Sequence, residues 1–253
     1  MKVAKFFAKA WTPLTSMWSD VKRFSLIGLV LTTIVLVAGC GTKETTQPVS
    51  SASSIRLLAL GDSYTIGQGV SQSNSWPFQL AAALRSDTLS VAQPTVVAAT
   101  GWTTSDLTTA IANANLDPPY EIVTLLIGVN DQFQGFTEDT YRPGFEALLQ
   151  QAVSFAGNDI RRVIVISIPD YTVTPFGKVN GQEGSREALD RFNAINKEIS
   201  TYRGVAYIDI TPNSRLAADD PALIASDDLH PSGKMYAGWV QDLLPIVQEI
   251  VRL

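Results

Sequence analysis

The chain has 253 residues, of which 45% are hydrophobic and 17% are charged, a balance typical of globular proteins. It contains one cysteine and one histidine, which excludes an intramolecular disulfide and metal sites built on two histidines or several cysteines. The formal net charge is −5, which argues against a basic nucleic-acid-binding face. We therefore expect no nucleic-acid partner.

The first forty residues have the pattern of a bacterial lipoprotein signal peptide. Basic residues precede an uncharged apolar segment, 24–38, of about fifteen residues, which is short for a membrane span and fits a signal-peptide core. The segment runs into VAGC at 37–40, which resembles the lipobox, where a peptidase cuts before a cysteine that then carries lipid. We expect 1–39 to be removed and Cys40 to be lipidated. An uncleaved anchor helix is the alternative, and Met17 is an alternative start.

The rest of the chain divides into a short linker and one domain. Residues 40–54 are rich in serine and threonine and lack apolar periodicity, which predicts a flexible tether. Neither an internal repeat nor a second linker follows, so 55–253 is predicted to be a single domain, and we expect a monomer. The lipid on Cys40 would hold this domain at a membrane outside the cytoplasm, on the periplasmic face or the cell surface.

Apolar runs alternate with helical patterns along the predicted domain. The predicted strands are 55–60, 96–100, 122–128, 163–168 and 205–210. The predicted helices are 76–86, 103–113, 145–156, 185–202 and 232–253. This alternation predicts a five-stranded parallel sheet with helices on both faces, a three-layer α/β/α sandwich. Ligands bind outside the carboxyl ends of the strands in such sheets, so the residues that follow each strand are the candidates for chemistry.

Glycines and polar residues follow the first three predicted strands. Ser63, in a Gly-Asp-Ser-Tyr sequence, is a candidate nucleophile close to the free N–H groups of a following helix or turn; its alternative role is a helix N-cap. Gly101 follows the second strand and offers an unobstructed backbone N–H. Asn130 follows the third strand and offers an uncharged side-chain donor. For both, the alternative is an ordinary turn.

The only histidine lies after the fifth predicted strand. Asp227 precedes His230 by three residues, so its carboxylate can bond one ring nitrogen and leave the other facing Ser63. A lone histidine is more often a surface or hydrogen-bonded core residue. Because these positions all follow strands, their combination favours a catalytic serine, a histidine base and an orienting aspartate.

These motifs resemble those of the GDSL, or SGNH, hydrolase family. The family's first motif matches at 61–64, with tyrosine in place of leucine, and its glycine matches Gly101. Its GxND motif matches at 128–131, and its DxxH motif matches at 227–230. The resemblance covers essentially the whole predicted domain and implies the flavodoxin-like fold of that family.

The resemblance also implies a mechanism that needs no metal or organic cofactor. Ser63, Asp227 and His230 would be catalytic, and an acyl-enzyme would form on Ser63. The backbone N–H groups of Ser63 and Gly101 and the side chain of Asn130 would form the oxyanion hole. The expected activity is hydrolysis of acyl esters of small molecules, lipids or glycans. An acyltransferase that uses the same residues and a non-catalytic binding lipoprotein are the alternatives.

The segment 170–184 follows the fourth predicted strand and is long and glycine-rich. We expect it to flank or cover the cleft. Four aromatic residues are candidates for an acyl or aromatic pocket, with structural packing as the alternative for each: Trp102, Phe133, Tyr171 and Phe176.

Overall fold

The computed structural model describes residues 54–86 and 88–252. The predicted signal peptide, Cys40 and all but the last residue of the predicted tether lie outside the described residues. Among the residues described, none of the helices combines the length and the apolar character that crossing a membrane requires.

The described residues contain five strands, which form one parallel sheet in the order β2-β1-β3-β4-β5. The strands are β1 (Leu57–Asp62), β2 (Thr95–Ala99), β3 (Ile122–Leu126), β4 (Val163–Ile166) and β5 (Ala206–Ile208). Every residue of β1, β3 and β4 is buried, as expected for strands covered on both faces. The predicted five-stranded parallel α/β fold is confirmed, and the strand order is that of flavodoxin-like folds.

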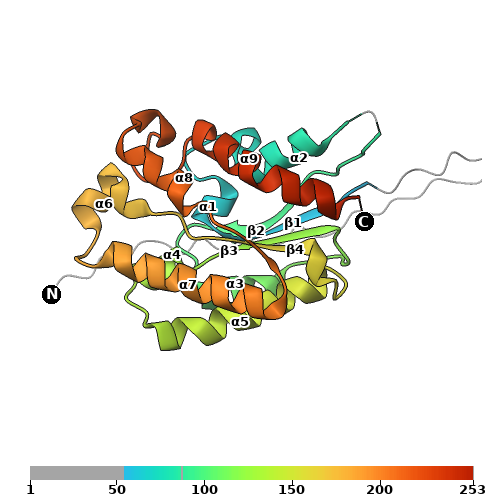
Figure 1. Cartoon of the computed structure of the whole chain (residues 1–253), viewed down its shortest axis with the longest axis horizontal. Coiled ribbons are helices and arrows are strands. Elements are labelled where there is room, and N and C mark those ends of the chain that lie inside the picture. Colours follow the sequence, from blue (N-terminus) through green and yellow to red (C-terminus); the bar gives the residue numbers. More distant parts are fainter. Residues whose placement is uncertain (1–53, 87, 253) are drawn as a thin grey trace, which may run out of the picture. The chain divides into compact units, whose positions relative to one another are not determined.

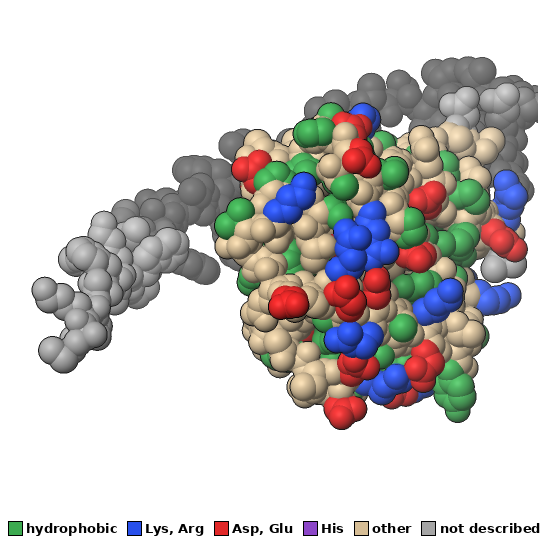
Figure 2. All heavy atoms as spheres, turned by 60° about the vertical axis from the view of Figure 1, so that its left-hand side comes forward, with side chains coloured by type: hydrophobic (Ala, Val, Ile, Leu, Met, Phe, Trp, Pro, Cys, Tyr) green, Lys and Arg blue, Asp and Glu red, His purple; other side chains and the backbone are tan. Residues whose placement is uncertain are grey.

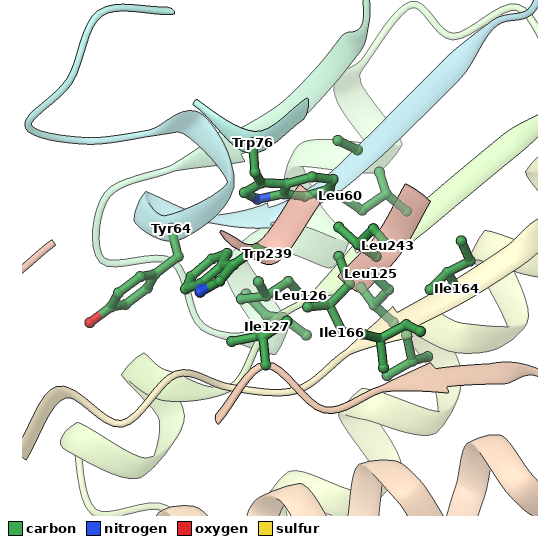
Figure 3. Packing of buried hydrophobic residues seen from close by; sticks show 14 of the residues in the cluster. Leu60, Tyr64, Trp76, Leu125, Leu126, Ile127, Ile164, Ile166, Trp239 and Leu243 are labelled. Carbon is green, nitrogen blue, oxygen red and sulfur yellow. The ribbon is translucent and has the colours of Figure 1, made fainter. Parts of the chain in front are cut away.

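Helices cover both faces of the sheet (Figure 1). One face carries α2 (Trp76–Leu84) and α9 (Gly233–Ile250), and the other carries α3 (Thr104–Asn113), α5 (Glu138–Phe155) and α7 (Ser185–Arg203). The largest buried side chains include Trp76 of α2 and Trp239 of α9. Figure 3 shows them packed beside strand residues such as Leu60 and Leu126, so the core on this face lies between the two helices and the sheet.

Four short helices were not predicted from the sequence: α1 (Ser63–Ile66), α4 (Val129–Phe133), α6 (Pro175–Asn180) and α8 (Thr211–Arg215). Each has four to six residues, too few to show a helical hydrophobic period. The described residues also contain single 3₁₀ turns: η1 (Gln72–Asn74), η2 (Ile160–Arg162), η3 (Tyr171–Val173), η4 (Leu216–Ala218) and η5 (Pro221–Leu223). The short helices follow strands, so they surround the carboxyl edge of the sheet.

Helix α5 begins seven residues before its predicted start. Thr137 caps it by accepting the N–H of Thr140, and Pro143 lies inside the helix. The sequence favoured a later start because proline and glycine stand at 143–144. Packing explains the glycine at 144, because a Cβ there would lie 2.8 Å from the hydroxyl oxygen of Thr104. The glycine therefore lets α5 lie close to α3.

Candidate active site

Ser63 is the first residue of α1, directly after β1. Asp62 is the N-cap, and its Oδ1 accepts the N–H of Tyr64 at 3.0 Å. The alternative in which Ser63 caps the helix is therefore wrong. A Cβ at Gly61 would collide with the side chain of Thr65 and the carbonyl oxygen of Leu126, so the tight exit from the strand requires glycine.

The side chain of Asp62 is fully buried, and its second oxygen, Oδ2, has no hydrogen-bond partner in the described part of the chain. Burial raises the pKa of Asp62 to about 8; the hydrogen bond from Tyr64 opposes this shift and the charge of Asp131 adds to it. Asp62 is therefore mostly neutral at pH 7. A neutral carboxyl places little negative charge beside the hydroxyl of Ser63.

Asp227 and His230 form a close pair. The Nδ1 atom of His230 lies 2.6 Å from Oδ2 of Asp227, while the backbone N–H groups of His230 and Leu229 donate to Oδ1 at 2.9 and 3.1 Å. Burial works to raise the pKa of Asp227, but these hydrogen bonds hold it below its ordinary value. The ionised carboxylate keeps a proton on Nδ1, which leaves Nε2 of His230 as a proton acceptor.

Three neighbours that sequence reasoning missed hold this pair in place. The ring of Tyr64 lies 5.1 Å from the nearly buried His230 ring, measured between centroids. Gly69 has a left-handed backbone (φ 84°), and a Cβ there would lie 3.0 Å from Oδ2 of Asp227. Asp228 has φ 61°, and its carbonyl oxygen accepts the N–H of Phe176 at 3.0 Å. Tyr64 and Asp228 lie within the motifs at 61–64 and 227–230, whereas the only sequence signal for Gly69 was the glycine itself, in GQG at 67–69.

Asn130 lies in α4, beside the turn between β2 and α3. Its Nδ2 donates to the carbonyl oxygen of Trp102 at 2.9 Å, which occupies one of the two amide N–H donors. The buried carboxylate of Asp131 accepts the N–H and the hydroxyl of Thr104 at 3.1 and 2.6 Å. These bonds tie α4 to the turn that carries Gly101. The other amide N–H of Asn130 makes no hydrogen bond to the described residues.

Gly101 is exposed and has φ 80°, and a Cβ there would meet no atom within 4 Å. The backbone conformation, rather than space, favours glycine. Gly101 does not line the pocket around Ser63, and its role as an oxyanion donor stays a prediction. Trp102 does not line that pocket either; its side chain packs against the core, which is the alternative role that the sequence left open for it. Thr103 caps α3 in a capping box with Asp106, as the alternative of an ordinary turn at this position expected.

The other predicted site residues lie in or beside one pocket of about 120 Å³. Ser63, Asn130 and His230 line it, and Asp227 lies behind His230. The remaining lining residues are mostly apolar: Tyr64, Val129, Phe133, Tyr171, Phe176 and Leu229. The segment 170–184 therefore flanks the cleft, as predicted, through η3 and α6. Among residues 54–86 and 88–252, we find no cluster of three side chains that could hold a metal ion.

A serine that shares a pocket with a histidine–aspartate pair, at the carboxyl edge of a parallel sheet, is the arrangement of an enzyme with a serine nucleophile. The family model of the GDSL-like lipase/acylhydrolases matches residues 59–237, so the chain belongs to this family. The protein is thus an enzyme of the esterase and acylhydrolase class.

Solved structures of similar fold include several enzymes. A lipase/acylhydrolase from Enterococcus faecalis is 20% identical, with 79% of this chain and 97% of that chain covered and a TM-score of 0.59. The acetylxylan esterase Axe2 from Geobacillus stearothermophilus is 19% identical over 77% and 94% of the two chains (TM-score 0.59). The esterase EstA from Pseudoalteromonas sp. is 15% identical over 78% and 99% (TM-score 0.58). These identities show a shared fold. No curated protein matches the sequence.

Proposed function

We propose that this enzyme is a serine-dependent carboxylic ester hydrolase that works through an acyl-enzyme. The supporting observation is the 2.6 Å contact between His230 Nδ1 and Asp227 Oδ2, in a site where His230 and Ser63 line the same pocket. Nε2 of His230 accepts the proton of Ser63 as its oxygen attacks the acyl carbonyl. Asp227 orients the ring and stabilises the imidazolium that forms.

The negative charge that develops on the carbonyl oxygen needs hydrogen-bond donors. We assign this role to the backbone N–H groups of Ser63 and Gly101 and to the second amide N–H of Asn130. Removal of one such donor typically costs about 10²–10³ in rate. The protonated His230 then donates to the leaving alcohol. Water attacks the acyl-enzyme with His230 as the base, which releases the acid and restores Ser63.

The test of this proposal is hydrolysis of p-nitrophenyl esters by the full-length wild type, Ser63→Ala and His230→Ala. We expect both variants to lose nearly all turnover while keeping the wild-type circular dichroism spectrum. Turnover by Ser63→Ala at the wild-type rate would reject the mechanism. Addition of alcohols during turnover detects acyl transfer, because an acyltransferase would form a new ester instead of the free acid.

We further propose that the enzyme is anchored by lipid on Cys40 at the cell envelope, where it acts on acyl esters of small molecules, lipids or glycans. The support is the VAGC sequence at 37–40, preceded by the apolar segment 24–38. Cys40→Ser should keep esterase activity and move the protein from the membrane fraction to the soluble fraction. If this variant still sediments with membranes, an uncleaved apolar helix holds it instead.

A further inference from the structure

Three aromatic side chains from separate segments meet on one wall of the pocket. The ring of Phe133 lies edge-on to that of Tyr171, with centroids 5.7 Å apart, and 6.1 Å from that of Phe176. Phe133 comes from α4, Tyr171 from η3 and Phe176 from α6. We call these three residues the aromatic wall. Tyr171 is buried, whereas Phe133 is 42% exposed and forms the outer rim.

The proposed chemistry indicates which part of an ester faces this wall. His230 must protonate the leaving alcohol, so the alcohol lies against His230. The carbonyl oxygen points to Asn130, which is on α4 three residues before Phe133, so one helical turn separates the oxyanion donor from the aromatic wall. The acyl substituent is the part that remains to occupy the wall.

We propose that the aromatic wall is the acyl-binding subsite and that it restricts the enzyme to esters of short acyl chains. This inference rests on the proposed ester hydrolysis. The pocket has a volume of about 120 Å³. One water occupies about 30 Å³ of liquid, and a dry cavity of about 150 Å³ binds benzene, so the pocket has room for about four carbon-sized groups, the acyl carbonyl included. A longer chain must extend past Phe133 into water.

The wall is held at a fixed distance from the proposed catalytic pair. Asp170, whose side chain is fully buried, caps η3 by accepting the N–H and hydroxyl of Thr172 at 2.9 and 2.5 Å. Its other oxygen lies 2.8 Å from Nε of Arg215 and 3.2 Å from Nε of Arg186. Phe176 is bound through its backbone N–H to Asp228, next to Asp227. These contacts hold the aromatic wall in place, so the wall can limit the length of the acyl chain.

The experiment measures kcat/KM for p-nitrophenyl esters from C2 to C12, with the alcohol constant, in the full-length protein. Each buried methylene should raise kcat/KM about fourfold, from its transfer free energy, until the pocket is filled. We expect a wild-type maximum near C4 and a decline or plateau beyond C6. Phe176→Ala keeps the N–H that binds Asp228 and should move the maximum to C6–C8, raising the C8/C4 ratio about tenfold.

Two further variants complete the design. Phe133→Ala opens the exposed rim at little risk to folding and should raise the same C8/C4 ratio. Val179→Ala, on α6 but 82% exposed and outside the pocket, is the matched control and should keep the wild-type profile. A wild-type maximum at C10 or longer, or profiles of Phe133→Ala and Phe176→Ala identical to that of Val179→Ala, would overturn the acyl assignment alone. Absence of Ser63-dependent hydrolysis at every chain length would overturn both this inference and the proposed function.

Discussion

His230 contacts both oxygens of Asp227: its ring Nδ1 lies 2.6 Å from Oδ2, and its backbone N–H donates to Oδ1 at 2.9 Å. The three-residue spacing of the motif makes both contacts possible within one turn of chain. The ring orientation and the loop conformation therefore depend on the same carboxylate. Asp227 thus has two roles, to orient the ring of His230 and to hold the loop, and a substitution can distinguish them.

Asp227→Asn should preserve the conformation of the loop and remove the negative charge of the carboxylate. The amide oxygen can still accept the backbone N–H of His230, but its NH₂ group cannot hold a proton on Nδ1. We expect kcat to fall about 10³–10⁴-fold, since the ring then presents the wrong tautomer to Ser63. KM and the unfolding midpoint should change little. A loss of less than tenfold in kcat would contradict the role of Asp227.

Gly69→Ala should displace Asp227 and so disturb its contact with His230. The new Cβ would lie 2.8 Å from the Cβ of Ala225 and 3.0 Å from Oδ2 of Asp227, in a left-handed backbone. Because the left-handed backbone is unfavourable for alanine, we expect the free energy of unfolding to fall by about 1–2 kcal/mol. We also expect kcat to fall at least tenfold. Gly184→Ala is the matched control, because Gly184 has a similar φ of 80° and open space around it. Equal kcat in the two variants would show that Gly69 matters only for folding.

Asp62→Asn should change how stability depends on pH. The pKa of Asp62 is about 8 in the folded protein, against an ordinary value of 3.8, so between pH 4 and 8 the unfolded chain loses this proton while the folded protein keeps it. The contribution of Asp62 to stability therefore falls as pH rises through that range, by several kcal/mol in total. Asparagine keeps the acceptor for Tyr64 and does not titrate.

The check is urea unfolding of the wild type and Asp62→Asn at pH 5 and pH 8. The difference between the two proteins isolates Asp62 from the other carboxylates, which contribute slopes of their own. The free energy of unfolding of the variant, relative to that of the wild type, should be higher at pH 8 than at pH 5. An identical pH dependence in the two proteins would mean that Asp62 titrates in the folded state as it does in the unfolded chain.

Asp170→Asn should loosen the aromatic wall. The buried carboxylate of Asp170 contacts Arg186 and Arg215, and Arg215 also contacts the exposed Asp190 at 2.6 Å. Basic and acidic side chains alternate on the face of the molecule in Figure 2. We expect Asp170→Asn to cost about 2 kcal/mol and to raise KM more than it lowers kcat. Asp190→Asn, at the exposed end, should cost less than about 1 kcal/mol. Equal effects of the two variants on KM would contradict the bracing role of Asp170.

The sequence predicted the sheet and the order of the candidate site because buried parallel strands are continuous apolar runs, with motif residues directly after them. It could not locate α4 and α6, which are shorter than two turns. It also could not show that Gly69 abuts Asp227 or that Phe133 meets Tyr171, because those contacts depend on how distant loops pack. For the same reason the sequence could not decide between pocket and packing for Trp102, whose ring packs against the core while its carbonyl accepts from Asn130.

The most direct test of the proposed mechanism is covalent labelling with a p-nitrophenyl phosphonate, followed by digestion and mass spectrometry. A phosphonate forms a stable bond to an activated serine, so the site of attachment identifies the nucleophile. We predict one label on Ser63, greatly slowed in His230→Ala, with loss of ester turnover in proportion to labelling. A label on another residue, or full turnover after complete labelling of Ser63, would contradict the mechanism.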